Sequence, residues 1–195
     1  MNIQQGKFLI IGLILMLPGL LFRTEAGEKL PVYESLGTEF TMESTVGEPL
    51  SLSRFQGRLV LIYFGYTSCP DICPTTLTVI KQAVQELRES GEVVQLLFIS
   101  VDPERDSVEQ MKTYLEFFDP EFIGLWGKID QVQEVSKKFG AFFLKNTGTQ
   151  SAVGYLVSHT GYVYLLDRQS RVRKLFSSKV DAEEIVETIR LLTDA

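Results

Sequence analysis

An unbroken apolar run at residues 59–64, Leu-Val-Leu-Ile-Tyr-Phe, constrains the fold of this 195-residue chain more than any other segment. The run has no polar face, and it stops at Gly65. Continuous apolar runs of this length are typical of strands that are buried on both faces of a sheet. Because parallel strands are joined through crossover helices, residues 59–64 predict the central strand of an α/β domain.

A helix is expected soon after this strand. Pro74 fits the first turn of a helix, and apolar residues then recur at helical spacing until Gly91 ends the pattern. A second buried strand is expected at residues 93–100. The only two cysteines of the chain, Cys69 and Cys73, therefore lie at a strand-to-helix junction. Open α/β sheets place their functional sites at this end of the strands.

The rest of the chain continues to alternate strands and helices. A hairpin around Gly47 is expected before the central strand, and Ser107 is expected to cap the second helix. The further predicted elements are hairpin strands at 40–43 and 49–52, helices at 107–118, 130–139 and 181–192, strands at 155–159, 162–166 and 172–176, and loops at 27–34, 102–106 and 146–154. This order predicts an α/β, thioredoxin-like fold with a mixed central sheet, an N-terminal β-hairpin and flanking helices.

The first 26 residues are interpreted as a targeting segment. Lys7 precedes an apolar run at residues 8–22, and Arg23 closes the run. The run is shorter than the roughly 20 residues that span a bilayer. A signal peptide at residues 1–26 is therefore favoured, and an uncleaved membrane anchor through residues 8–22 stays open. Either interpretation predicts an exported domain at residues 27–195.

The composition is typical of one acidic globular domain. Hydrophobic residues make up 45% of the chain and charged residues 23%, which is sufficient for a sizeable core. The formal net charge is −6. Because nucleic-acid binding depends on basic side chains that neutralise phosphates, we expect no nucleic-acid partner.

The spacing of Cys69 and Cys73 permits either a disulfide or a shared metal ion. A helix that begins within the loop would place them about one turn apart on one face. A helix N-terminus also stabilises the thiolate, which is both the nucleophile and the metal ligand. A structural staple is disfavoured, because closing so short a loop removes only about 2 kcal/mol of unfolded-chain entropy. The three intervening residues depart from the two-residue spacing of common redox motifs, so both chemistries stay open.

His159 is the only histidine of the chain, and it ends a strand that is expected to run beside the central one. From there its ring could approach the two thiolates. Two soft thiolates and one imidazole suit Cu(I) and Cu(II). Zinc is the competing metal, but a structural zinc site needs four ligands and would require a carboxylate or water here. Copper is the better fit.

Three segments resemble the Sco/SenC family of copper-binding, thioredoxin-like proteins. They are residues 63–74 (Tyr-Phe-Gly-Tyr-Thr-Ser-Cys-Pro-Asp-Ile-Cys-Pro), the acidic turn at residues 100–106, and residues 158–160. The resemblance covers roughly residues 35–195. Two positions depart from the family pattern, because Ser68 stands where histidine is common and Ser158 stands where an acid usually precedes the ligand histidine.

The resemblance implies that Cys69, Cys73 and His159 are copper ligands. Asp102 is similar in position to an acid near the family's site, and Asp71 lies between the two cysteines. Either could set the thiolate pKa or accept hydrogen bonds outside the ligands, and the alternative is that both only cap turns. Such outer groups commonly tune a metal site. The copper-binding domain would then be residues 27–195.

The function implied by the same resemblance is an exported copper metallochaperone that supports assembly of the dinuclear copper centre of cytochrome c oxidase. Its place would be the periplasmic side of a bacterial inner membrane. Its partners would be the copper-bearing oxidase subunit, a copper donor chaperone and an external thiol reductant. Copper transfer needs no turnover chemistry, and a mobile loop at residues 146–154 is expected to let His159 withdraw.

Two other functions use the same residues. In the first, the chain is a thiol–disulfide reductase whose redox-active pair, Cys69 and Cys73, keeps the acceptor's cysteines reduced. In the second, the chain is a copper or redox sensor. The sequence has no feature specific to the sensor.

Overall fold

The structure, a computed structural model, describes residues 30–151 and 154–193, without the side chains of residues 147–151. The targeting segment at residues 1–26 lies outside the described residues, so both interpretations of it stay predictions. Within the described ranges, no helix combines the length and the apolar character needed to cross a bilayer.

A mixed seven-stranded sheet forms the centre of the domain, in the order β2-β1-β5-β4-β3-β8-β9. Strands β3, β4 and β5 run parallel, and the other neighbours in this sheet are antiparallel. The strands of the sheet are β1 (Thr41–Ser44), β2 (Leu50–Ser51), β3 (Leu59–Gly65), β4 (Val94–Ser100), β5 (Ile123–Trp126), β8 (Val163–Leu166) and β9 (Val172–Phe176). The predicted α/β, thioredoxin-like fold is confirmed.

Strand β3 has the central position that its apolar sequence predicts. Leu61 pairs with Leu96 of β4 on one side and with Leu165 of β8 on the other. Every residue of β3 is buried. A strand with two hydrogen-bonded neighbours and a helical layer on each face has no solvent-facing side, which is why the run lacks polar residues.

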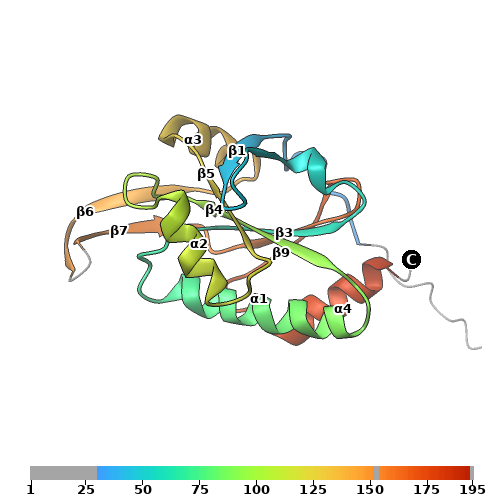
Figure 1. Cartoon of the computed structure of the whole chain (residues 1–195). Coiled ribbons are helices and arrows are strands. Elements are labelled where there is room, and N and C mark those ends of the chain that lie inside the picture. The colour runs from blue at the N-terminus through green and yellow to red at the C-terminus, as the bar shows by residue number, and fades with distance from the viewer. Residues whose placement is uncertain (1–29, 152–153, 194–195) are drawn as a thin grey trace, which may run out of the picture.

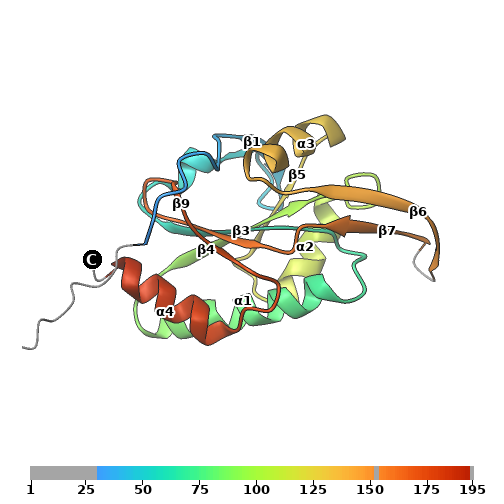
Figure 2. The same cartoon turned by 180° about the vertical axis from the view of Figure 1, so that it is seen from behind.

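Helices cover both faces of the sheet. Figures 1 and 2 show α1 and α4 side by side on one face, with α3 on the opposite face. Helix α2 packs against β5. The helical elements described are the short 3₁₀ helix η1 (Leu52–Phe55) and α-helices α1 (Ile72–Glu89), α2 (Val108–Glu116), α3 (Ile129–Lys138) and α4 (Ala182–Thr193).

The ends of the first two long helices follow from local chemistry. Helix α1 begins at Ile72, two residues before Pro74, so Cys73 lies inside its first turn and Cys69 precedes it. Helix α2 starts with the predicted cap, because the Ser107 hydroxyl accepts the backbone N–H of Gln110 at 3.2 Å. The Gln110 side chain in turn accepts the backbone N–H of Ser107 at 2.9 Å, which completes a capping box.

One strand of the sheet was absent from the sequence prediction. Strand β5 has four residues, one of which is Gly124, and it shows no apolar alternation. Glycine is needed there, because a Cβ atom on Gly124 would lie 2.8 Å from the side chain of Thr45 and 3.1 Å from Leu115. Close packing against Thr45, which follows β1, and Leu115 of α2, rather than strand propensity, therefore determines this residue.

The loop predicted at residues 146–154 was wrong. Residues Phe143–Ser151 form strand β6, which pairs antiparallel with β7 (Gly154–His159) in a separate two-stranded sheet. Figures 1 and 2 show this ribbon extending from the body of the domain. Strand β6 could not be recognised from its polar, glycine-containing sequence, because the strand is formed by pairing with β7 rather than by packing of an apolar face.

The strand that carries His159 was also expected beside the central strand, and this expectation was wrong. Strand β7 pairs with β6, and the next strand, β8, is the antiparallel neighbour of β3. Only residues 160–162 separate β7 from β8. The chain therefore leaves the ribbon and enters the sheet directly after His159.

The buried carboxylate of Asp167, between β8 and β9, predicts a pH-dependent part of the stability. Burial acts to raise the pKa of Asp167, but hydrogen bonds from Arg171 and Arg173 outweigh it and lower the pKa below its ordinary value. Asp167 therefore stabilises the fold above its unfolded-state pKa of about 4, and this contribution is lost as the pH falls through its lower folded-state value.

Asp167→Asn is expected to lower the free energy of unfolding by about 2 kcal/mol at pH 7, since hydrogen bonds to a charged group are broken. The difference from the wild type should shrink below about pH 4. Urea unfolding at several pH values measures it, with the exposed Glu187→Gln as a control for removing one negative charge. A difference that stays constant between pH 7 and pH 3 would contradict the assignment.

Candidate metal centre

The loop that contains Cys69, residues 66–71, is called the cysteine loop and begins where β3 ends. Gly65, the last residue of β3, lets helix α1 approach the sheet. A Cβ atom on Gly65 would lie 2.7 Å from the ring of Phe98 and 3.0 Å from the Sγ atom of Cys73. Both of these side chains are fully buried. The absence of a side chain at residue 65 therefore creates the space that Cys73 occupies.

His159 reaches the cysteines from the end of the ribbon. It pairs with Phe143 of β6. The adjacent Thr160 forms three hydrogen bonds with the backbone of Phe142. Its backbone N–H donates to the Phe142 carbonyl at 2.8 Å, its hydroxyl accepts the Phe142 N–H at 2.9 Å, and the same hydroxyl donates to the Phe142 carbonyl at 3.3 Å. These bonds fix the backbone on which His159 is carried.

Cys69, Cys73 and His159 form a compact cluster. Their ligand atoms all lie within 4.8 Å of one another, and the Sγ atom of Cys73 is 3.4 Å from Nε2 of His159. Nδ1 of His159 is 3.2 Å from the carbonyl oxygen of Thr160. Since a carbonyl only accepts hydrogen bonds, Nδ1 carries a proton, and Nε2 is the ring nitrogen that faces the thiols and could bind a metal ion. In the described part of the chain, no other group of three or more histidine, cysteine, aspartate or glutamate side chains could hold a metal ion.

The pKa values of the two cysteines are shifted in opposite directions. A hydrogen bond from Cys73 is the main cause that lowers the pKa of Cys69, and this effect outweighs partial burial of the sulfur. Hydrogen bonds from His159 and from the backbone N–H groups of Asp71 and Cys73 lower it further. The same hydrogen bond, together with burial and the nearby charge of Cys69, raises the pKa of Cys73. Cys69 is therefore the thiolate and Cys73 the thiol, and binding of a metal to both sulfurs must release the Cys73 proton.

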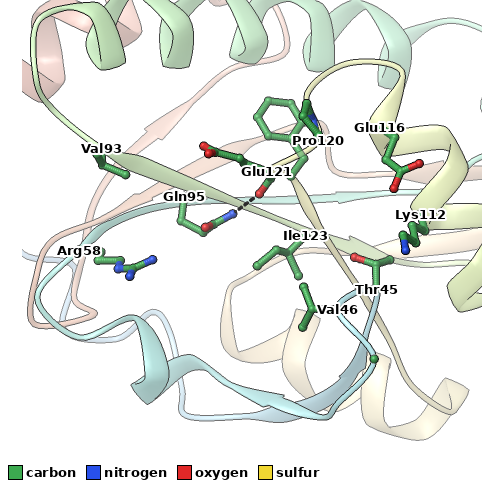
Figure 3. A pocket seen from close by; sticks show the side chains of 12 residues that line it. Thr45, Val46, Arg58, Val93, Gln95, Lys112, Glu116, Pro120, Glu121 and Ile123 are labelled. Carbon is green, nitrogen blue, oxygen red and sulfur yellow. Dashed lines mark hydrogen bonds between the residues drawn. The ribbon is translucent and has the colours of Figure 1, made fainter.

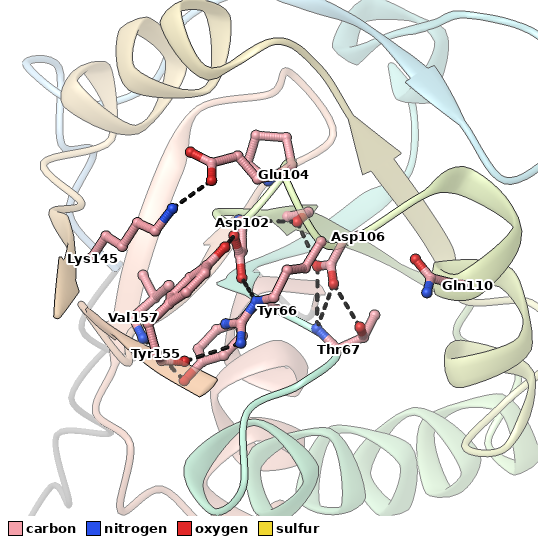
Figure 4. A network of polar contacts seen from close by, with 12 residues as sticks. Tyr66, Thr67, Asp102, Glu104, Asp106, Gln110, Lys145, Tyr155 and Val157 are labelled. Atoms are coloured by element: carbon pink, nitrogen blue, oxygen red, sulfur yellow. Dashed lines mark hydrogen bonds and ion pairs between the residues drawn. The ribbon is translucent and has the colours of Figure 1, made fainter. Parts of the chain in front are cut away.

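Asp106 holds Thr67 of the cysteine loop in place. Its buried carboxylate accepts hydrogen bonds from the Thr67 hydroxyl at 2.6 Å, from the Thr67 backbone N–H at 3.2 Å and from the Ser100 hydroxyl at 2.6 Å. Figure 4 shows Asp106 and Thr67 facing each other. No role of Asp106 was predicted from the sequence, although it lies in the acidic turn at residues 100–106.

Asp102 connects the same turn to the ribbon. Its carboxylate accepts hydrogen bonds from the Tyr155 hydroxyl at 2.7 Å and from the Arg105 side chain. Arg105 also donates to the backbone carbonyl of Tyr155 at 3.0 Å, and its guanidinium lies 3.8 Å from the centre of the Tyr155 ring. Figure 4 shows this network, with Lys145 of β6 paired to Glu104 at its edge. These contacts hold β7, and hence His159, against the body of the domain.

Two buried tyrosines that the sequence analysis missed surround the histidine ring. The ring centroids of Tyr66 and His159 are 5.8 Å apart, and those of Tyr63 and His159 are 6.2 Å apart, both edge-to-face. The Tyr66 hydroxyl also accepts the backbone N–H of Val157 at 3.3 Å. The apolar motif residues next to the cysteines therefore orient the imidazole as well as fill the core.

The structure brings three of the five proposed site residues together. Cys69, Cys73 and His159 form the cluster, whereas neither carboxylate belongs to it. Asp71 is exposed at the start of α1 and contributes a backbone N–H to the Cys69 sulfur. Asp102 contacts Tyr155 and Arg105. The role of all five residues in binding a metal stays a prediction.

A separate pocket lies at the other end of the parallel strands. Its volume is about 580 Å³, and Figure 3 shows it between the starts of β4 and β5, near Gln95 and Ile123, with Lys112 of α2 at its wall. None of its twelve lining residues is a cysteine or histidine. The pocket therefore offers no soft ligands, and the cysteine cluster is the candidate site.

Comparison with known proteins identifies the relatives of this chain. The sequence model of the SCO1/SenC family matches residues 29–194. The chain belongs to the SCO1/SenC family. A SCO2-like protein of Rickettsia conorii is 34% identical over 203 residues, which cover 97% of this chain and 99% of that protein.

Two solved structures with copper bound are similar to this chain. Arabidopsis thaliana ScoI with copper bound is 30% identical, with a TM-score of 0.77, and the match covers 82% of this chain and 99% of the other. Bradyrhizobium japonicum ScoI with copper bound is 35% identical, with a TM-score of 0.71 and coverage of 80% and 99%. The SCO1/SenC fold of this chain is thus shared with copper-bound relatives.

Proposed function

We propose that this SCO1/SenC protein is an exported copper metallochaperone that supports assembly of the dinuclear copper centre of cytochrome c oxidase. The observation that carries the proposal is the cluster of two sulfurs and one imidazole nitrogen within 4.8 Å. Two thiolates suit Cu(I), and the added imidazole suits Cu(II). The copper-bound relatives support the same metal.

The uneven burial of the ligands favours transfer of the metal. Cys73 is fully buried, whereas Cys69 and His159 are half-buried at the surface. A thiolate of the copper-bearing oxidase subunit could therefore approach the metal from the side of Cys69 and His159. Ligand exchange would then proceed with Cys73 as the last ligand to be released, without any turnover chemistry.

The periplasmic location belongs to the same proposal. The apolar run at residues 8–22 would export the domain, either as a signal peptide or as an anchor. Export places Cys69 and Cys73 in an oxidising compartment, so an external thiol reductant would be needed to keep both thiols available. A copper donor chaperone would deliver the metal to them.

A thiol–disulfide reductase is the second candidate, and the protonation of the two thiols favours it. Cys69 is the half-buried and more accessible member of the pair and is a thiolate, whereas Cys73 is buried and retains its proton. This is the arrangement of an attacking and a resolving thiol. The reductase would act on a disulfide between the two copper-binding cysteines of the oxidase subunit.

A transfer experiment tests the two candidates directly. The reduced chain is loaded with one equivalent of Cu(I) and mixed with the copper-free, reduced copper-bearing oxidase subunit, and copper is measured on each protein after separation. The metallochaperone predicts that copper moves to the subunit. If copper stays on the chain while the metal-free, reduced chain rapidly reduces the disulfide form of the subunit, the reductase replaces the metallochaperone.

A further inference from the structure

Two buried hydroxyl groups lie behind the cysteine cluster without a hydrogen-bond partner. They belong to Tyr63 of β3 and Thr76 of α1, and within the described ranges neither oxygen has a hydrogen bond of normal geometry. Tyr63 is completely buried, and Thr76 is 3% exposed. Buried hydroxyls without partners are rare, because they give up their hydrogen bonds to water and gain none in return.

The environment of Thr76 shows that its orientation is unusual. The neighbouring Thr75 and Thr78 donate their hydroxyl protons to the backbone carbonyls of Asp71 and Pro74, four residues earlier in α1. This is the common arrangement for threonine inside a helix. Thr76 does not use it. It lies three residues after Cys73, on the same buried face of α1, beside the Tyr63 hydroxyl.

The Tyr63 hydroxyl also faces the buried sulfur of Cys73. The hydroxyl of a neutral tyrosine is a hydrogen-bond donor. Tyr63 lies on the same side of β3 as Gly65, where an added Cβ atom would be 3.0 Å from the Sγ atom of Cys73. The Tyr63 ring contacts Phe98 and His159, with centroid distances of 6.1 and 6.2 Å, which fixes its direction. A neutral thiol is a weak acceptor, whereas a metal-bound thiolate sulfur carries negative charge and accepts hydrogen bonds well.

We propose that Tyr63 is a positioning residue of the metal centre, whose hydroxyl donates a hydrogen bond to the metal-bound sulfur of Cys73 while Thr76 donates to the Tyr63 oxygen. This chain of two hydrogen bonds gives each orphan hydroxyl a partner. It also provides the buried sulfur with the donor that water cannot supply at this depth. The inference rests on the proposed copper function, because the hydrogen bond to sulfur forms when the metal replaces the Cys73 proton.

The inference is tested by the absorption spectrum of the Cu(II)-loaded protein. Loss of a hydrogen bond makes the Cys73 sulfur a stronger electron donor, so Tyr63→Phe should move the sulfur-to-copper charge-transfer band to longer wavelength. Copper affinity should fall by about tenfold, as is common when an outer group of a metal site is removed. Thr76→Val should shift the band in the same direction by less, and Thr76→Ser should restore the wild-type position.

Tyr164 provides the matched control. It is another completely buried tyrosine whose hydroxyl has no partner among the described residues. Its ring packs against Phe64, which points to the opposite face of the sheet from Tyr63 because neighbouring strand residues alternate. Tyr164→Phe should therefore leave both the band and the copper affinity unchanged.

The outcomes separate the two proposals. A wild-type chain that shows no charge-transfer band with Cu(II) overturns the copper function. If the wild type shows a normal band and Tyr63→Phe does not shift it, the role of Tyr63 is overturned and the copper function stands. This holds even if the copper affinity falls, because a purely structural effect would lower the affinity without changing the electron donation by sulfur. If Tyr63→Phe fails to fold in thermal melts followed by circular dichroism, an unshifted band in Thr76→Val overturns the inference instead.

Discussion

His159→Ala is expected to weaken Cu(II) binding by more than about 100-fold. Removing a residue that only supports a metal ligand costs up to about 100-fold in affinity, and removing a ligand itself should cost more. His159 is the sole nitrogen donor of the cluster, and its Nε2 atom is 3.4 Å from the Cys73 sulfur. Cu(II) prefers sites that include nitrogen, whereas Cu(I) is held well by two thiolates. We therefore expect a smaller loss for Cu(I) than for Cu(II). Competition titrations with chelators of known affinity measure both.

The same variant separates metal binding from thiol chemistry. Because His159→Ala leaves Cys69 and Cys73 in place, the rate of reaction with a model disulfide should change by less than about threefold, a shift of under 1 kcal/mol. Ser158→Ala is the neighbouring control, since Ser158 is exposed and its hydroxyl accepts a hydrogen bond from Asn146. Cu(II) affinity that survives the loss of His159 unchanged would show that the three-ligand site is wrong.

The second large effect concerns the fold around the cysteine loop. Gly65→Ala would place a methyl group 2.7 Å from Phe98 and 3.0 Å from the Cys73 sulfur. Overpacking of a filled core costs about 1–3 kcal/mol, and both neighbours here are fully buried. We expect unfolding free energy to fall by about 3 kcal/mol, at the upper end of that range. Copper affinity should fall as well, because Cys73 is displaced.

A double-mutant cycle identifies the cause of this loss. Phe98→Leu alone should destabilise the domain by leaving space in the core, but in the Gly65→Ala background the smaller side chain makes room for the added methyl group. The double variant is therefore expected to be at least about 1 kcal/mol more stable than the sum of the single effects predicts. Additive losses in urea unfolding would show that Gly65 and Phe98 do not clash.

Much of the fold could be predicted from the chain because its strongest signals are local. The apolar run at residues 59–64 and the Ser107 cap both determine their own conformation, and the structure confirms them. Strands β5 and β6 could not be recognised in the same way. β5 depends on space left for Thr45 and Leu115, and β6 depends on pairing with β7.

The candidate site also has some residues that local sequence predicts and others that depend on distant contacts. Cys69 and Cys73 could be found because they are the only two cysteines and lie four residues apart, and His159 could be added because it is the only histidine. The expected route of His159 was wrong, since its ligand atom arrives from the ribbon rather than from a neighbour of the central strand. The positioning by Asp106 and the orientation of the Tyr63 hydroxyl depend on contacts between distant segments, which residue spacing does not encode.

The central claim is that one copper ion is held by the two sulfurs of Cys69 and Cys73 and the imidazole of His159. X-ray absorption at the copper edge of the loaded, reduced chain tests it most directly, because sulfur and nitrogen scatterers are distinguished by their distances from copper. We expect two sulfur ligands and one nitrogen ligand, with the nitrogen lost in His159→Ala. A copper environment of oxygen and nitrogen alone, or one that is identical when both cysteines are replaced by alanine, would contradict it.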